Sequence, residues 1–214
     1  MLSDPLDDVM RRVIGHDRAH VVAEYRALAR ELAAFPPVLD VGCGSGTLLE
    51  TLGELRVDAR GVDASATAVA ASRARGYQVD QADLLEFLGR APQGAYGGLF
   101  AGHVVEHLAP DAARTLFAHA ARVLRPGGRF LVLTPNPRNL YVAGEGFWID
   151  PTHVRPYPAP LLRTLAIDAG FRTVTVRRWW GGMPIRQVVS GAVRWVATAG
   201  LHDPAPALLC IAGA

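Results

Sequence analysis

The sequence predicts an α/β fold in which a doubly wound, mostly parallel sheet carries helices on both faces. Short and almost wholly apolar runs, such as residues 38–41, alternate with segments whose apolar residues recur every three or four positions. Runs without a polar side suit strands that are buried on both faces, as in parallel sheets. The chain has 214 residues, half of them hydrophobic, which is enough for a single domain with a full core.

The elements follow in a regular order. A helix over about 18–34 places Val21, Tyr25, Leu28 and Leu32 on one face, and prolines at 36 and 37 end it. Ser65 is a predicted N-cap. The expected strands are 38–41, a segment ending at 63, 77–80, 96–105, 129–135, 171–180 and 206–213. The other expected helices are 48–55, 65–75, 113–124, 161–169 and 185–199.

Composition narrows the class of protein. The 22 basic residues are all arginine and are scattered along the chain, so nucleic acid is not an expected partner. The absence of lysine excludes Schiff-base chemistry and a phosphate-binding loop of the Walker type. Cys43 and Cys210 show no metal-ligand or disulfide spacing, and no apolar run is long enough to span a membrane. We therefore expect a cytoplasmic protein.

Three glycines follow the first predicted strand. In an open parallel sheet, ligands bind beyond the carboxyl ends of the strands, and glycine lets a ligand approach the main chain closely. The spacing is D-x-G-x-G-x-G over residues 40–46. A dinucleotide fingerprint, G-x-G-x-x-G from Gly42, would need glycine where Thr47 stands. An adenosine compound other than a dinucleotide is the expected ligand.

This motif resembles the first motif of the class I S-adenosylmethionine-dependent methyltransferases, and the likeness extends over about residues 36–179. It implies a Rossmann-like, seven-stranded sheet whose last strand is antiparallel, with S-adenosylmethionine as cofactor. We expect one methyltransferase domain over 1–214, made of a helical cover (1–35), the core (36–179), a helical insertion (180–203) and the final strand (204–214). Asp63 would bind the ribose, and Asp83 with Leu84 the adenine. The cofactor-binding residues that the resemblance implies are Asp40, Gly42, Cys43, Gly44, Gly46, Asp63, Ala64, Asp83, Leu84 and His103.

The acceptor side is expected after the fourth strand, in "GHVVEHL", and after the fifth, in "FWIDPTHVRPYP". The first stretch resembles the E-x-x-E-H metal motif of small-RNA 2′-O-methyltransferases and the matching loop of ubiquinone-pathway O-methyltransferases, with His103 in place of the first glutamate. The resemblance implies a divalent metal on Glu106, His107 and His153. His107 or His153 could instead be a metal-free general base, or the histidine could merely cap the next helix.

The segment "DPTHVRPYP" resembles bacterial methyltransferases of cell-surface glycan synthesis. We therefore expect transfer of a methyl group to a hydroxyl of a small molecule or glycan precursor. Phe147, Trp148, Arg155 and Tyr157 are candidate acceptor contacts. Two alternatives stay open: a metal-dependent RNA 2′-O-methyltransferase and a non-catalytic protein that binds an adenosine ligand. The 185–199 helix could cover a core, form a dimer contact or touch a membrane surface, and the oligomeric state is left open.

Overall fold

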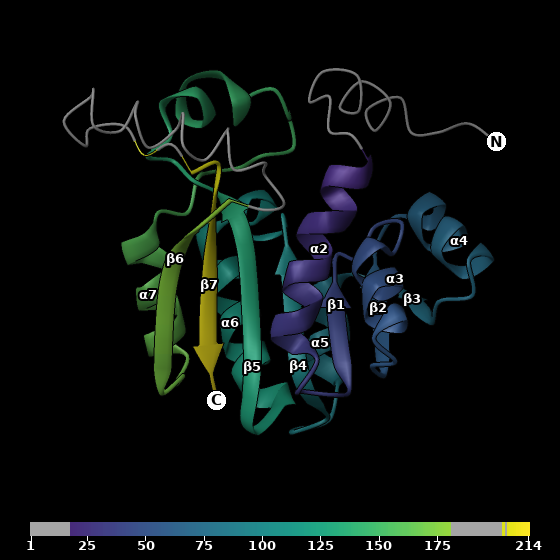
Figure 1. The fold of residues 1–214 in the computed structure, drawn as a ribbon. Helices are drawn as coiled ribbons and strands as arrows, with labels where there is room; N and C mark the ends of the chain where they lie inside the picture. Colours follow the sequence, from purple (N-terminus) through teal and green to yellow (C-terminus); the bar gives the residue numbers. More distant parts are fainter. Residues whose placement is uncertain (1–17, 181–202, 204) are drawn as a thin grey trace.

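The computed structural model describes residues 18–180, 203 and 205–214 (Figure 1). Its seven strands form one sheet in the order β3-β2-β1-β4-β5-β7-β6. The sheet is parallel except for β7, which runs antiparallel to both β5 and β6. The strands are β1 (Val38–Val41), β2 (Ala59–Asp63), β3 (Val79–Gln81), β4 (Tyr96–Gly102), β5 (Leu124–Pro135), β6 (Thr173–Trp179) and β7 (Ala207–Gly213).

Helices cover both faces of the sheet. One face packs against α5, α6 and α7, and the other against α2 and α3. Helix α4 closes the edge near β3 through Val69 and Val79. The helices are α2 (Arg18–Leu32), α3 (Thr47–Glu54), α4 (Ala66–Ala74), α5 (Leu84–Arg90), α6 (Pro110–Val123) and α7 (Ala159–Asp168), with a 3₁₀ turn η1 (Val105–His107) and a π-helical turn η2 (Val142–Gly146).

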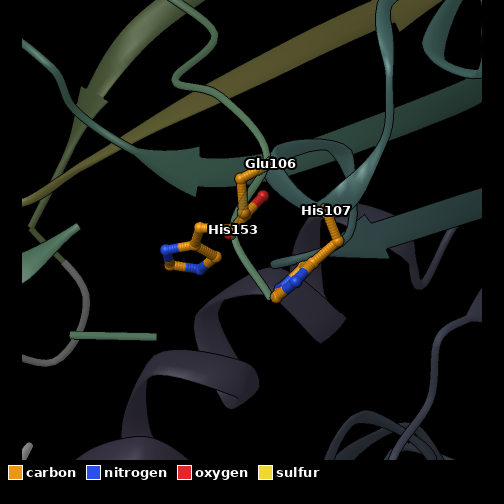
Figure 2. Close-up of side chains that lie close together, drawn as sticks. All are labelled: Glu106, His107 and His153. Atoms are coloured by element: carbon orange, nitrogen blue, oxygen red, sulfur yellow. The ribbon is translucent and has the colours of Figure 1, made fainter. Parts of the chain in front are cut away.

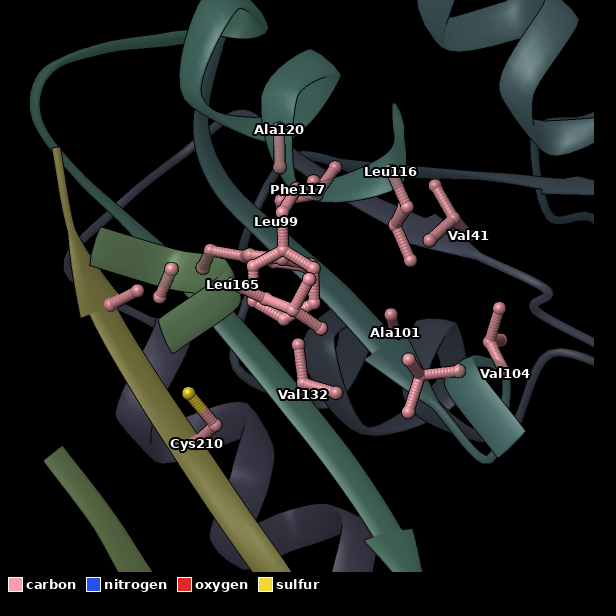
Figure 3. Close-up of a cluster of buried hydrophobic side chains, with 14 of the residues drawn as sticks. Val41, Leu99, Ala101, Val104, Leu116, Phe117, Ala120, Val132, Leu165 and Cys210 are labelled. Carbon is pink, nitrogen blue, oxygen red and sulfur yellow. The ribbon is translucent and has the colours of Figure 1, made fainter. Parts of the chain in front are cut away.

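The larger core lies between the sheet and α6 (Figure 3). Phe117 of α6 packs edge-to-face on Phe130 of β5, with ring centroids 5.3 Å apart, and both side chains are fully buried. Phe117 belongs to the apolar stripe of α6, whose residues recur at helical spacing because one side of the helix faces the sheet. The core holds β4 and β5 in place, and the loops that leave their carboxyl ends project from this rigid base.

The order of the strands creates the point where a ligand crevice is expected. Strand β1 pairs in parallel with β2 on one side and with β4 on the other. The chain therefore builds the sheet outward from β1 to β2 and β3, and then crosses back to place β4 on the opposite side of β1. The loops after β1 and β4 therefore diverge over opposite faces of the sheet. Such a switch point is where open α/β sheets bind their ligands.

The predicted fold class is confirmed, including the single antiparallel strand. The structure corrects some boundaries and adds α5, which was not predicted because seven residues give too short a pattern. The predicted strand 96–105 ends at Gly102, since the chain then turns into η1. The predicted helix 185–199 and residues 1–17 lie outside the described residues. Within the described part, no helix is both long and apolar enough to cross a membrane.

Candidate active site

The glycine loop joins β1 to α3 with a left-handed backbone at three positions. Gly42, Gly44 and Gly46 have φ angles of 70°, 52° and 82°, a region that residues with a Cβ rarely adopt. A Cβ on Gly42 would lie 2.6 Å from Val104, and one on Gly46 would lie 2.8 Å from Tyr77. A Cβ on Gly44 would meet nothing within 4 Å. Two of the glycines are thus required by packing, whereas the third leaves open space beside the main chain.

Asp63 ties this loop to the next strand. It ends β2, and its Oδ2 accepts a hydrogen bond of 2.8 Å from the N–H of Gly44. Its Oδ1 accepts another of 2.8 Å from the N–H of Ser65, across Ala64. Each carboxylate oxygen has a second lone pair, so Asp63 keeps acceptor capacity for two hydroxyl groups. The predicted ribose-binding carboxylate therefore lies beside the predicted glycine crevice.

Asp40 is a buried carboxyl group in β1, with 2% of its surface exposed. Burial, followed by repulsion from the nearby charge of Asp63, raises its pKa well above the ordinary value. Its neighbour in the motif, Cys43, packs its side chain into the core against Gly61, and burial raises the pKa of the thiol. Any contact of Cys43 with a ligand must therefore come from its main chain. A cation nearby would favour the ionised form of Asp40.

Asp83 has a structural task besides the one predicted for it. Its Oδ1 accepts hydrogen bonds from the N–H groups of Leu85 and Glu86, at 2.9 and 3.0 Å, which makes Asp83 the N-cap of α5. Leu84 is the first residue of that helix, and a first-turn N–H has no acceptor within its own helix. The N–H of Leu84 and the second oxygen of Asp83 remain suited to the edge of an adenine ring, as predicted.

An exposed histidine and a buried glutamate are paired at the end of β4. His103 has a φ of 55°, unusual for a non-glycine residue, and its Nδ1 lies 3.1 Å from Oε1 of Glu106. Glu106 is fully buried, and its Oε2 accepts a 3.0 Å hydrogen bond from Thr134. Burial alone would lower the pKa of His103 and raise that of Glu106, but their mutual interaction outweighs it in both cases. The pKa of His103 is raised and that of Glu106 lowered, and both directions favour the charged forms of the pair.

His107 and His153 come together beside Glu106 (Figure 2). The segment after β5 folds back onto η1, where the N–H of Val154 donates a 2.8 Å hydrogen bond to the carbonyl of Glu106. This brings the two imidazole rings to a centroid distance of 4.7 Å. One candidate ligand atom from each of Glu106, His107 and His153 lies within 4.8 Å of the others.

This group has the chemistry of a divalent-metal site. Two imidazole nitrogens and one carboxylate oxygen suit zinc, iron or manganese. His103 contacts Glu106 but does not belong to the group. The oxygens of Glu106 already accept bonds from His103 and Thr134, yet each keeps a lone pair. The predicted ligand set is therefore assembled, and the same imidazoles are equally placed to take a proton.

The candidate acceptor contacts separate into buried and accessible ones. Phe147 and Tyr157 are only 2% and 1% exposed, and the hydroxyl of Tyr157 donates to the carbonyl of Leu108, so both pack the core. Trp148 is 59% exposed. Arg155 has a buried Nε that lacks a hydrogen-bond partner among the described residues. Trp148 is therefore the most exposed of the four, and Arg155 carries a donor that is unpaired among the described residues.

Tyr25 is a site residue that the sequence pattern did not reveal. Its ring packs edge-to-face on Phe100, and its hydroxyl lies over the end of β4, 3.5 Å from where a Cβ on Gly102 would be. Burial, and then the charge of Asp40, raise the pKa of this phenol, with smaller contributions from Glu24 and Glu106. The sequence predicted Tyr25 only as one of the apolar residues on one face of the helix that the structure shows as α2. Asp40 of β1 and Glu106 of η1 reach it only through the tertiary fold, so no local pattern could identify it.

A glycine crevice at the switch point, with a carboxylate at the end of the next strand, defines the class of Rossmann-like S-adenosylmethionine-dependent methyltransferases. A family model described as "Methyltransferase domain" matches residues 14–176. The chain belongs to this family.

Known proteins agree with this assignment. A probable S-adenosylmethionine-dependent methyltransferase of Mycobacterium tuberculosis is 35% identical over 173 residues, which cover 80% of this chain and 61% of the relative. The chain thus spans about three fifths of the length of that relative. A ubiquinone biosynthesis O-methyltransferase of Xanthomonas oryzae pv. oryzae is 33% identical over 104 residues, covering 46% of this chain and 43% of the relative.

A solved structure shows the same fold. The crystal structure of a SAM-dependent methyltransferase from Archaeoglobus fulgidus covers 99% of this chain and 100% of its own, with a TM-score of 0.85 and 24% sequence identity. The crevice also fits S-adenosylmethionine on its own chemistry. Gly44 leaves open space beside the main chain, Asp63 keeps acceptor capacity for hydroxyl groups, and Asp40 is a carboxyl group that a cationic ligand would ionise.

Proposed function

We propose that the protein transfers a methyl group from S-adenosylmethionine to a hydroxyl group of a small molecule or glycan precursor. The observation that carries the proposal is the assembly of His107, His153 and Glu106 at the turn after β4, in the same loop as Val104, which packs against the glycine loop. The loop that carries Glu106 and His107 contacts the glycine loop, because Val104 packs against Gly42 so closely that no side chain would fit on that glycine.

The cofactor, when bound, supplies a methyl group on a sulfonium that is already electrophilic. The chain has to hold the acceptor in line with it and remove the proton of the hydroxyl. An imidazole nitrogen of His107 or His153 can accept that proton directly. Alternatively, Glu106, His107 and His153 can hold a divalent ion that lowers the pKa of the hydroxyl.

Two features support a hydroxyl acceptor on a compact molecule. Trp148 offers an exposed aromatic surface for a ring, and Arg155 offers hydrogen-bond donors for an oxygen. The matched relative from Xanthomonas oryzae carries the name of an O-methyltransferase, and the match includes nearly half of this chain.

The two alternatives differ in what they require. A non-catalytic adenosine-binding protein has no need for paired imidazoles beside the crevice, so the observed cluster favours an enzyme. An RNA 2′-O-methyltransferase would use the same cluster with a metal, but it would also need a basic surface for the phosphates. Several arginines of the described part are instead paired with acids, as Arg26 is with Glu54 and Arg129 with Glu31.

A transfer assay with radiolabelled S-adenosylmethionine tests the proposal. The acceptor panel is methyl glucoside, a nucleoside-diphosphate sugar, catechol and a short single-stranded RNA, each with EDTA and with manganese or zinc. Transfer to a sugar or catechol supports the proposal, and loss with EDTA and recovery with metal assign Glu106, His107 and His153 as ligands. Transfer to RNA alone, or tight cofactor binding without transfer to any acceptor in a broadened panel, would overturn it.

A further inference from the structure

His107 also has a hydrogen-bond partner within the protein. Its Nδ1 lies 2.9 Å from the hydroxyl oxygen of Thr152. That hydroxyl donates a 2.6 Å hydrogen bond to Oδ1 of Asp150, and the N–H of Thr152 donates a second one of 2.8 Å to the same oxygen. One carboxylate oxygen of Asp150 therefore holds Thr152 through both its side-chain hydroxyl and its main-chain N–H.

The direction of each hydrogen bond follows from counting protons. A carboxylate can only accept, so the single proton of the Thr152 hydroxyl points to Asp150. The hydroxyl oxygen has only lone pairs left for His107. The Nδ1 of His107 must then carry the proton, and in a neutral ring its Nε2 holds the free lone pair.

His153 reaches the same tautomer by a different route. Its Nδ1 lies 2.6 Å from the main-chain carbonyl oxygen of Phe147, which can only accept, so this nitrogen also carries a proton. A neutral His153 would therefore also have its lone pair on Nε2, which lies 3.8 Å from Oδ2 of Asp150. The tautomer of His153 is set by the main chain, whereas that of His107 is set by a side chain that can be replaced.

We propose that Thr152, held in place by Asp150, is a positioning residue that fixes His107 as the Nδ1–H tautomer and keeps its Nε2 free to react. The inference rests on the proposed role of His107 and holds whether His107 is a general base or a metal ligand, because both roles need a nitrogen lone pair. Partners that orient a histidine in this way are a general feature of metal sites, and their removal typically costs about 10–100-fold in affinity or activity.

Thr152→Val and Thr152→Ser form a matched pair for the test. Valine keeps the shape of threonine and lacks the hydroxyl, while serine keeps the hydroxyl and loses only a methyl group. The primary measurement is the ¹⁵N chemical shifts of the imidazole nitrogens in ¹⁵N-histidine-labelled protein bound to S-adenosylhomocysteine, which requires no acceptor. We expect Thr152→Val to shift His107 away from the pure Nδ1–H tautomer and Thr152→Ser to retain it, with His153 unchanged as an internal reference.

Asp150→Asn is a second variant that keeps the size of the side chain. An amide can donate as well as accept, so Thr152 can then turn its proton toward His107, and a mixture of tautomers is expected. In the transfer assay, the rate should fall about tenfold in Thr152→Val and Asp150→Asn and stay near wild type in Thr152→Ser. An unchanged His107 tautomer in both Thr152→Val and Asp150→Asn overturns the inference.

A separate variant distinguishes failure of the inference from failure of the proposed function. If His107→Ala transfers methyl groups at the wild-type rate, His107 has no role in the reaction, and the proposed function of the cluster fails. The tautomer shifts would still decide whether Thr152 positions the ring. Full activity of Thr152→Val together with a shifted tautomer would likewise overturn the catalytic part of the inference.

Discussion

The two halves of the active site are built in different ways. On the cofactor side, the ends of β1 and β2 are connected by main-chain geometry, with left-handed glycines and N–H groups that Asp63 binds directly. On the acceptor side, side chains from two segments far apart in the sequence meet, as Thr152 does with His107. The first half is specified locally, whereas the second depends on a long segment folding back. We infer that cofactor binding and acceptor chemistry can be changed independently.

The halves also differ in their electrostatics. Burial, and then the negative charge of Asp63, raise the pKa of Asp40. On the other side, Glu106 is balanced by His103, and its pKa is lowered despite burial. A positive charge, such as the sulfonium of S-adenosylmethionine, would favour the ionised form of Asp40, whereas Glu106 already has His103 as its partner.

The largest expected effect comes from removing a side chain of the acceptor half. His107→Ala should lower kcat by about 10²–10⁴-fold, the usual contribution of a general base, with the affinity for S-adenosylhomocysteine unchanged. The transfer assay and isothermal titration calorimetry measure the two quantities separately. His119→Ala, which removes a histidine on α6 away from the cluster, is the control and should keep full activity. A parallel loss of cofactor affinity in His107→Ala would show that the two halves are not independent.

A smaller effect is expected in the cofactor half. Asp63→Ala should weaken the binding of S-adenosylmethionine by about 1.5–3 kcal/mol, the scale for losing charge-assisted hydrogen bonds. The loss of support for the N–H groups of Gly44 and Ser65 contributes to it. Calorimetry measures the change. Asp80→Ala is the control, since Asp80 lies on the neighbouring strand and pairs with Arg60 instead. Equal affinity in wild type and Asp63→Ala would remove the ribose role.

Much of the cofactor half could be predicted from the sequence, because its geometry is encoded locally. Glycines at 42, 44 and 46 follow a short apolar run, and each has the left-handed backbone that favours glycine. The predicted N-cap is also confirmed, since the hydroxyl of Ser65 accepts a hydrogen bond from the N–H of Ala68. These predictions needed only neighbours within a few positions. Asp83 shows the limit, because its predicted ligand role gave no hint of the helix that it caps.

The acceptor half could be predicted only in outline. Resemblance to known methyltransferases suggested that Glu106, His107 and His153 form a group, and the structure brings them together. The residues that orient them, Thr134 and Thr152, lie on β5 and in the segment after it. No periodicity or spacing links a threonine to a histidine so far away in the chain. Such contacts follow from tertiary packing, which a single sequence does not display.

A third prediction separates the conformational role of glycine from its role in binding. Gly44 and Gly76 both have positive φ angles and open space where a Cβ would be, so alanine at either position should cost about 1–2 kcal/mol of stability. Only the space at Gly44 belongs to the crevice. Gly44→Ala should also weaken S-adenosylmethionine about tenfold, which corresponds to about 1.4 kcal/mol, while Gly76→Ala leaves affinity unchanged. Urea unfolding and calorimetry give the two quantities. Equal affinities in the two variants would mean that the cofactor does not approach Gly44.

The smallest effect concerns the charge balance of the acceptor half. The raised pKa of His103 means that the folded state binds its proton more tightly than the unfolded chain. The resulting stability is fully present below the unfolded pKa of about 6.5 and is lost as the pH rises through the folded pKa. Because His103 is 46% exposed, solvent screening limits the contribution. His103→Gln should therefore lower the free energy of unfolding by about 0.5 kcal/mol at pH 6 and by less at pH 9.

A control of opposite sign sharpens this measurement. Burial, aided by the charge of Arg122, lowers the pKa of His119, so this residue costs stability at acidic pH and the cost disappears as the pH rises through the unfolded value. Relative to wild type, His119→Gln should accordingly be more stable at pH 6 than at pH 9, whereas His103→Gln should be less stable at pH 6 than at pH 9. Urea unfolding of both variants at the two pH values measures the contrast. If the two variants respond to pH in the same direction, the His103–Glu106 pair is not charged in the folded protein, and the acceptor half lacks the balance that distinguishes it from the cofactor half.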